Sequence, residues 1–179
     1  MPISDQVVEA DWRVGRVLVI EGKSPTEQLL AKLQQVNANY GYGPLTAENG
    51  VALSLEAARA LQRIAATDSK VFDARTAEEA LTKALNTHAS EEVRIAATRV
   101  LAQLNTPTSQ AAIAAVALSD KQTPTLRITT FASLAESAQL LGNRLNEALT
   151  KELVAQARSE PNLDLRTAAS KALGATINM

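Results

Sequence analysis

The chain contains no cysteine, one histidine and few aromatic residues, since tryptophan, tyrosine and phenylalanine make up 3% of its 179 residues. Without cysteine it can form neither a disulfide framework nor a thiolate zinc site, which fits a reducing compartment. The single histidine, His88, excludes a cluster of histidine ligands and leaves one possible base for a serine nucleophile. We therefore expect no metal, no cofactor and no catalytic activity, and we expect a cytoplasmic protein.

The chain also lacks a surplus of either charge and a long apolar run. Lysine and arginine total 18 against 19 for aspartate and glutamate, which gives a formal net charge of −1. A protein that mainly binds nucleic acid needs a basic surplus on some surface to neutralise phosphates, so a nucleic acid partner is not expected. No segment approaches the roughly 20 apolar residues of a membrane helix, and the first residues lack the blocks of a signal peptide. We expect no membrane association.

What the chain does contain is aliphatic, because hydrophobic residues reach 46% although aromatic residues are scarce. The core must therefore consist of alanine, leucine, valine and isoleucine. Small alanine side chains let helices approach closely, and alanine and leucine are strong helix formers. The composition predicts closely packed helices.

Residues 1–50 differ in pattern from the rest of the chain and are expected to form an N-terminal segment. A β-branched apolar run predicts that any strand is confined to Val14–Ile20, although a buried helix edge has the same signature. The sequence SPTEQLLAKLQQV predicts a helix over 24–36, and the glycines and tyrosines of 37–44 predict a loop. The helical domain is expected over 51–179.

The N-terminal segment also resembles the opening strand, helix, strand and turn of a response-regulator receiver domain. Such a domain needs an acidic pair at the end of its first strand and a phosphorylatable aspartate at the end of its third. Here Glu21 is followed by Gly22, and no suitable third strand is evident. A functional receiver is therefore not expected, and a degenerate receiver-like signalling segment stays as an alternative.

Beyond this segment, apolar residues recur at helical spacing and capping residues mark the helix starts. Thr76 with Glu79 forms one capping box, Ser90 precedes two glutamates, and Thr123 precedes Pro124. The runs QAAIAAVALSD and RLNEALTKELVAQAR predict two further helices. The pattern is an alternation of helices and short turns.

Three segments repeat one motif, in which an arginine follows an apolar residue and precedes a leucine by seven positions. They are VRIAATRVLA (93–102), LRITTFASLA (126–135) and LRTAASKALG (165–174), and LSLEAARALQ (53–62) aligns as a copy without the arginine. This motif resembles the second helix of HEAT-like repeats over residues 51–179. The resemblance implies an all-α fold, a right-handed α-solenoid of antiparallel helix pairs whose second helices line a concave binding wall.

The repeated arginines are Arg94, Arg127 and Arg166. Residues seven apart return to nearly the same helical face, so each arginine lies toward the packed seam with its leucine. We expect the arginines to tie turns and adjacent repeats together by hydrogen bonds to turn carbonyls or acidic side chains. Asp120 is the expected partner of Arg127, and Glu160 or Asp164 that of Arg166. A ligand-binding row of arginines is the alternative.

The side of the second helices that faces away from this seam is the candidate binding surface. The residues expected to contact a partner are Leu55, Arg59, Ile95, Arg99, Ile128, Phe131 and Lys171. An apolar groove flanked by cations suits an extended or helical acidic peptide. The alternative is that repeat curvature or the N-terminal segment covers the apolar members.

We therefore expect a non-catalytic protein-protein interaction scaffold, a fragment of a larger protein, that binds a protein or peptide partner on its concave face. HEAT-like repeats also occur in bilin lyases and in DNA glycosylases, so an enzyme or enzyme accessory is the alternative. The glycosylase alternative needs a basic concave face with aromatic contacts, for which the sequence offers Trp12 and two tyrosines near the N-terminus. The oligomeric state is left open.

Overall fold

The computed structural model describes residues 47–66, 73–104 and 106–177, which form seven α-helices and one short 3-10 helix and contain no strand. The elements are α3 (Ala47–Ala66), η1 (Ala74–Ala77), α4 (Glu78–Thr87), α5 (Glu91–Gln103), α6 (Pro107–Leu118), α7 (Pro124–Leu141), α8 (Glu147–Ser159) and α9 (Leu163–Ile177). The predicted all-α class is confirmed for this part of the chain. The predicted strand at Val14–Ile20, the helix over 24–36 and the receiver-like segment lie outside the described residues.

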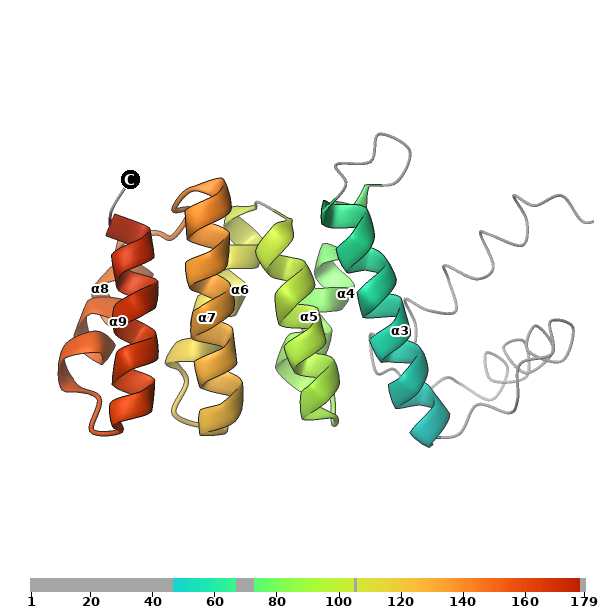
Figure 1. Cartoon of the computed structure of the whole chain (residues 1–179), viewed down its shortest axis with the longest axis horizontal. Coiled ribbons are helices and arrows are strands. Elements are labelled where there is room, and N and C mark those ends of the chain that lie inside the picture. The colour runs from blue at the N-terminus through green and yellow to red at the C-terminus, as the bar shows by residue number, and fades with distance from the viewer. Residues whose placement is uncertain (1–46, 67–72, 105, 178–179) are drawn as a thin grey trace, which may run out of the picture.

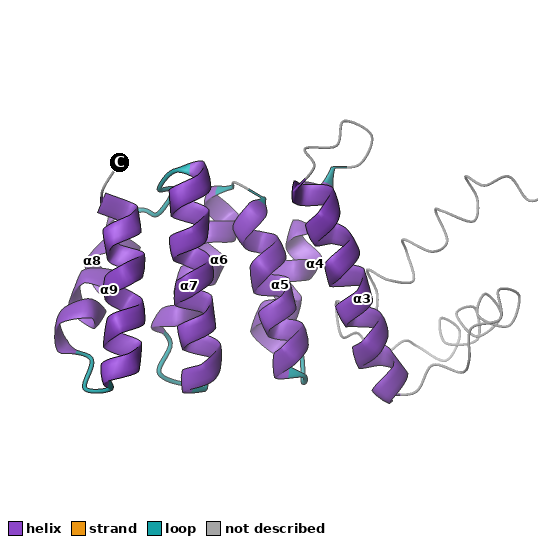
Figure 2. Cartoon of the chain, in the orientation of Figure 1, coloured by secondary structure: helices purple, strands orange, loops and turns teal. Residues whose placement is uncertain are grey.

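The helices lie in two layers (Figure 1 and Figure 2). One layer contains α3, α5, α7 and α9, which pack side by side in chain order, and the other contains α4, α6 and α8. Each helix of the second layer packs against the helix that follows it in the chain, α4 on α5, α6 on α7 and α8 on α9. The stack therefore advances by one position with every pair of helices. None of the described helices is long and apolar enough to cross a lipid bilayer.

Polar side chains cap the starts of five α-helices. The capping residues are Ser90 for α5, Thr106 for α6, Thr123 for α7, Asn146 for α8 and Asn162 for α9, and each accepts a hydrogen bond from a backbone N–H of the first turn. Such a cap satisfies one of the N–H groups that have no partner inside the helix. The starts predicted at Ser90 and Thr123 are confirmed. The α6 helix begins at Pro107, earlier than the run that predicted it.

The cap predicted at Thr76 is wrong. Asp73 caps η1 instead, because its carboxylate accepts a hydrogen bond from the Arg75 N–H, and the Thr76 hydroxyl donates to the Asp73 carbonyl oxygen at 2.8 Å. The chain thus enters α4 through a 3-10 turn, and Ala77 occupies the position before α4 without a side-chain cap. Asp73 and Thr76 are both residues that can cap a helix, and here the earlier one, Asp73, determines where the helical segment begins.

The core is built from aliphatic side chains and one aromatic ring. Its largest fully buried hydrophobic members are Phe131, Leu81, Leu85, Leu101, Ile113, Leu126, Leu134, Leu153, Val93 and Val100. Phe131 is 0% exposed, so the prediction that it lines a surface groove is wrong. Three residues turn a helix by about 300°, so Phe131 lies about 60° away from Ile128 around α7. This rotation moves the ring from the surface edge into the core cluster, where Leu134, Leu165 and Ala169 also lie.

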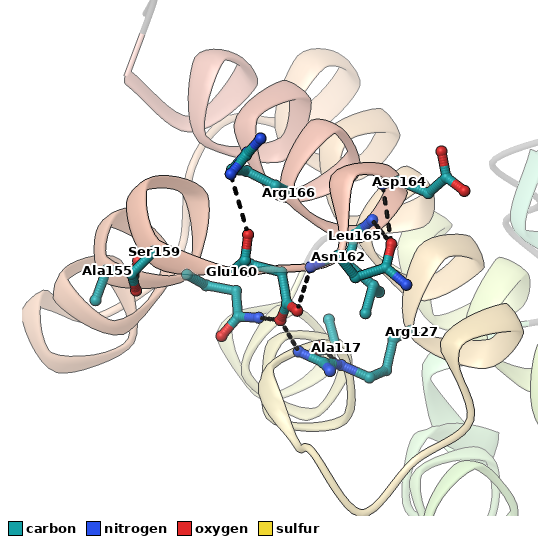
Figure 3. A network of polar contacts seen from close by, with 10 residues as sticks. Ala117, Arg127, Ala155, Ser159, Glu160, Asn162, Asp164, Leu165 and Arg166 are labelled. Atoms are coloured by element: carbon teal, nitrogen blue, oxygen red, sulfur yellow. Dashed lines mark hydrogen bonds and ion pairs between the residues drawn. The ribbon is translucent and has the colours of Figure 1, made fainter.

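Each arginine of the repeated motif bonds the turn that precedes its own helix. Arg94 Nε donates to the Leu85 carbonyl oxygen at 2.7 Å, and Arg127 Nε donates to that of Ala117 at 3.0 Å. Arg166 Nη1 donates to the Glu160 carbonyl oxygen at 3.4 Å (Figure 3). Carbonyls in the last turn of a helix lack a partner within that helix, and a guanidinium satisfies one of them. The prediction that the arginines tie the turns is confirmed.

Two of these arginines also reach the next helix pair. Arg94 Nη2 donates to Gln122 Oε1 at 2.6 Å, and Arg127 Nη2 bonds Glu160 Oε2 at 3.3 Å. The side chains of Arg127 and Glu160 are 8% and 11% exposed, so this ion pair is largely shielded from water. Asp120 is therefore the wrong partner for Arg127. It lies exposed in the turn of the same helix pair, whereas the guanidinium extends to the following pair.

A buried amide makes a second connection between consecutive pairs. Gln110 is fully buried in α6, and its Nε2 donates to Ser137 Oγ at 3.0 Å and to the Gly142 carbonyl oxygen at 2.8 Å. Its Oε1 accepts from the backbone N–H of Arg144 at 2.7 Å. Because both donors and the acceptor are used, burial of this amide carries no unpaired group. Through these hydrogen bonds, Gln110 holds the turn between α7 and α8 against α6.

Hydroxyl groups at the helix starts make further connections of the same kind. Thr123 Oγ1 donates to Glu91 Oε2 at 2.6 Å, and Ser109 Oγ donates to Glu78 Oε1 at 2.6 Å. Thr106 Oγ1 donates to the same oxygen of Glu78. These partners stand 32, 31 and 28 residues apart. These sequence separations are close to the length of one helix pair with its turns. Hydrogen bonds between polar side chains therefore join successive helix pairs in both layers.

His88 has a capping role in the turn between α4 and α5. Its Nδ1 accepts a hydrogen bond from the Ser90 N–H at 3.0 Å, which requires that nitrogen to be unprotonated. Burial lowers the pKa of His88, and the charge of Arg94 acts in the same direction. The ring is therefore neutral near pH 7 and holds the residue that caps α5.

Replacing Phe131 by alanine should lower the free energy of unfolding by about 3 to 5 kcal/mol, because a fully buried ring leaves a cavity. Ile128→Ala is the matched control, since Ile128 lies on the same helix but is half-buried at the surface. Urea unfolding followed by circular dichroism measures both. A loss for Phe131→Ala no greater than that for Ile128→Ala would contradict the burial of the ring.

Candidate partner-binding surface

Described residues of α3, α5, α7 and α9 line two grooves on the layer that these helices form. The first, between α3 and α5, has a volume of about 240 Å³ and is lined by Leu55, Ala58, Arg59, Gln62, Glu92, Ile95, Ala96 and Arg99. The second, between α7 and α9, has a volume of about 880 Å³ and is lined by Ile128, Ala132, Ala135, Glu136, Gln139, Asp164, Thr167, Ala168, Lys171, Gly174 and Ala175. We call them the α3/α5 groove and the α7/α9 groove.

Six of the seven residues predicted to contact a partner line these grooves. Leu55, Arg59, Ile95 and Arg99 come together in the α3/α5 groove, whereas Ile128 and Lys171 lie in the α7/α9 groove. Phe131 lines neither, because its ring is in the core. The structure thus divides the predicted surface into two separate sites on one layer.

The repeated motif explains why these residues share a layer. Leu55, Ile95 and Ile128 hold one position of the motif, directly after the arginine position. Four residues further on stand Arg59, Arg99 and Lys171 on α3, α5 and α9. Residues four apart lie on the same helical face, so each helix presents both positions to the same surface. The row is interrupted at Ala132 on α7, which has no charge, and at Thr167 on α9.

The aliphatic members of the surface are half-buried, and the cations are exposed. Ile95 and Ile128 pack against the core with one edge and face the grooves with the other. Arg59, Arg99 and Lys171 form no hydrogen bond or ion pair with any described residue of the chain. Their charges are therefore available to a partner.

Acidic residues, none of which was among those predicted to contact a partner, make the two grooves electrostatically different. Glu92 lines the α3/α5 groove beside two arginines. Glu136 and Asp164 line the α7/α9 groove with one lysine. The α3/α5 groove is therefore the more basic of the two. Two of these acidic residues could have been found from the repeated motif, because Glu92 on α5 and Asp164 on α9 both stand two residues before the motif arginine.

Gly174 lines the α7/α9 groove and faces open space. A Cβ atom added to Gly174 would meet no atom within 4 Å, although the residue lies inside α9. Gly142 is a different case: it ends α7 with φ 86° and ψ 157°, a backbone conformation that other residues rarely adopt. The first glycine leaves space, and the second makes a turn.

The described residues contain no group of three or more histidine, cysteine, aspartate or glutamate side chains that could hold a metal ion. Comparison of the chain with protein-family models, with curated proteins and with solved structures finds no match. The function must therefore be inferred from the two grooves, their charges and the arrangement of the helices.

Replacing Gly174 by alanine should raise the free energy of unfolding by about 0.5 to 1 kcal/mol, because alanine favours the helix and its methyl group enters open space. Gly142→Ala should instead destabilise the protein, since alanine at a positive φ is strained. Urea unfolding of both variants measures the two effects. Destabilisation by Gly174→Ala would mean that the α7/α9 groove is filled at this point.

Proposed function

We propose that the chain is a HEAT-like, right-handed α-solenoid of antiparallel helix pairs that serves as a non-catalytic scaffold and binds a protein partner. Three observations support this assignment: the two layers, the order of packing along the chain and the polar connections about one repeat apart. Repeats of this kind stack through nearest-neighbour interfaces and present one layer as an extended surface. The partner binds the layer of α3, α5, α7 and α9.

The observation that carries the proposal is the recurrence of a cation without a partner among the described residues, next to a half-buried aliphatic side chain. Arg59 accompanies Leu55 on α3, and Arg99 accompanies Ile95 on α5, within one groove. An aliphatic side chain of a partner can bury itself against Leu55 and Ile95 while its carboxylates pair with the two guanidinium groups. An acidic segment with an aliphatic anchor therefore fits the α3/α5 groove.

The charges of the grooves favour a protein over DNA as the partner. A surface that tracks a phosphate backbone excludes acidic side chains, but Glu92, Glu136 and Asp164 line the grooves. Among the residues that line either groove there is no aromatic side chain on which a base could stack. A partner with mixed charge and aliphatic anchors matches this surface better than a nucleic acid does.

The double variant Arg59→Glu/Arg99→Glu tests the proposed surface. The control is Lys83→Glu/Arg158→Glu, which makes the same change in net charge at exposed positions of α4 and α8 in the other layer. We expect the control to retain a partner captured by the wild-type chain, and the groove variant to weaken it about tenfold or more. Quantitative mass spectrometry of captured proteins, followed by titration with the purified partner, gives the comparison. Equal retention by both variants would contradict the proposed surface.

A further inference from the structure

One stripe of α9 is exposed although the equivalent stripe of α7 is buried. On α9 it consists of Leu163, Arg166, Ser170, Leu173 and Ile177, spaced three and four residues apart along one face of the helix. On α7 the residues equivalent to the last four are Arg127, Phe131, Leu134 and Ala138, none more than 6% exposed. We call the α9 residues the outer stripe.

At three positions of the outer stripe, side chains of α9 are more exposed than the equivalent buried side chains of α7. Ile177 is 59% exposed, whereas Ala138 at the equivalent position of α7 is 0% exposed. Leu163 is 65% exposed, but Pro124 at the equivalent position of α7 is exposed as well, so the contrast rests on the other positions. Ser170 is exposed and Leu173 half-buried, although their equivalents Phe131 and Leu134 are fully buried. The repeat therefore predicts a packed neighbour on this side of α9.

Arg166 also lacks one of the two contacts that the other motif arginines make. Arg94 bonds the turn before its helix and then Gln122 of the next pair, and Arg127 likewise bonds Glu160 of the next pair. Arg166 bonds the Glu160 carbonyl oxygen, and among the described residues it has no second partner (Figure 3). Its remaining donors lie on the same stripe as the exposed aliphatic side chains.

The two interfaces inside the chain show what such a stripe binds. The stripe of α5 is covered by the α6–α7 pair and that of α7 by the α8–α9 pair, each with an amide or carboxylate in the turn between its helices. A second α9 related by a two-fold axis would fit less well, because the outer stripe contains no amide or carboxylate to accept from Arg166. By analogy with these two interfaces, a helix pair with an acceptor in its turn matches the surface and its arginine.

We propose that the outer stripe of α9 is a docking surface for a helix pair of a partner protein. The pair packs as α8 and α9 pack on α6 and α7, and a glutamate or glutamine in its inter-helix turn accepts a hydrogen bond from Arg166. The charge-assisted bond sets the register, and Leu173 and Ile177 supply the apolar contact. This surface is separate from the two grooves, so failure of either proposal leaves the other standing.

The test extends the chain by a helix pair known to fit the equivalent stripe. A second copy of residues 139–177 follows Ile177 directly, because Ile177 is equivalent to Ala138 and the join keeps the helical register. If the outer stripe accepts the pair, the urea midpoint should rise by about 1 M and the added residues should be helical by circular dichroism. An unchanged midpoint together with unstructured added residues would overturn the proposal.

Two variants separate specific docking from a general effect of added helix. Arg166→Met should remove much of the gain in the extended chain and change the parent chain little, since Arg166 makes one long hydrogen bond there. Ile177→Glu should behave in the same way. A gain that both variants leave intact would contradict docking on the outer stripe.

The oligomeric state of the parent chain tests the choice of occupant. Light scattering across a concentration series should find a monomer, because the proposed occupant is a different protein. A dimer that Ile177→Glu dissociates would mean that a second copy occupies the stripe, and would overturn the proposal as stated.

Discussion

The structure depends on a guanidinium group that bonds two turns at once. In α5 and α7 the motif arginine satisfies a last-turn carbonyl of the preceding helix and also reaches the turn of the next pair. The first bond joins the two helices of a pair, and the second joins that pair to the next one. Arginine suits this position because its planar group carries several donors at fixed angles. Burial lowers the pKa of Arg94, but a guanidinium stays charged in proteins.

Because the helix pairs stack in chain order, equivalent positions of the motif come to lie on the same layer. The position after the arginine supplies Leu55, Ile95 and Ile128, and the cations follow four residues later. The surface is therefore a consequence of the stacking, and its charges are set by single residues at a position that packing does not constrain. This separation lets an arginine that joins helix pairs and a cation that lines a groove occur on one helix, as Arg94 and Arg99 do on α5.

The features that could be predicted from the sequence are those that depend on near neighbours. Ser90 and Thr123 cap their helices because the donors they bond lie three residues away. The turn carbonyl that each arginine bonds lies six to ten residues away. What could not be predicted depends on the neighbouring pair. Arg127 pairs with Glu160, which lies 33 residues away in the sequence. Phe131 lies about 60° around α7 from the half-buried Ile128, and only the packing of neighbouring helices against α7 determines that Phe131 is buried.

A double-mutant cycle between Arg127 and Glu160 tests most directly whether the arginine joins consecutive helix pairs. Urea unfolding gives the free energies of the wild type, Arg127→Met, Glu160→Ala and the double variant. Because the two side chains are 8% and 11% exposed, we expect a coupling energy of about 1 to 3 kcal/mol, with the double variant losing less than the sum of the single losses. Additive losses, within about 0.5 kcal/mol, would mean that the pair does not hold the stack together.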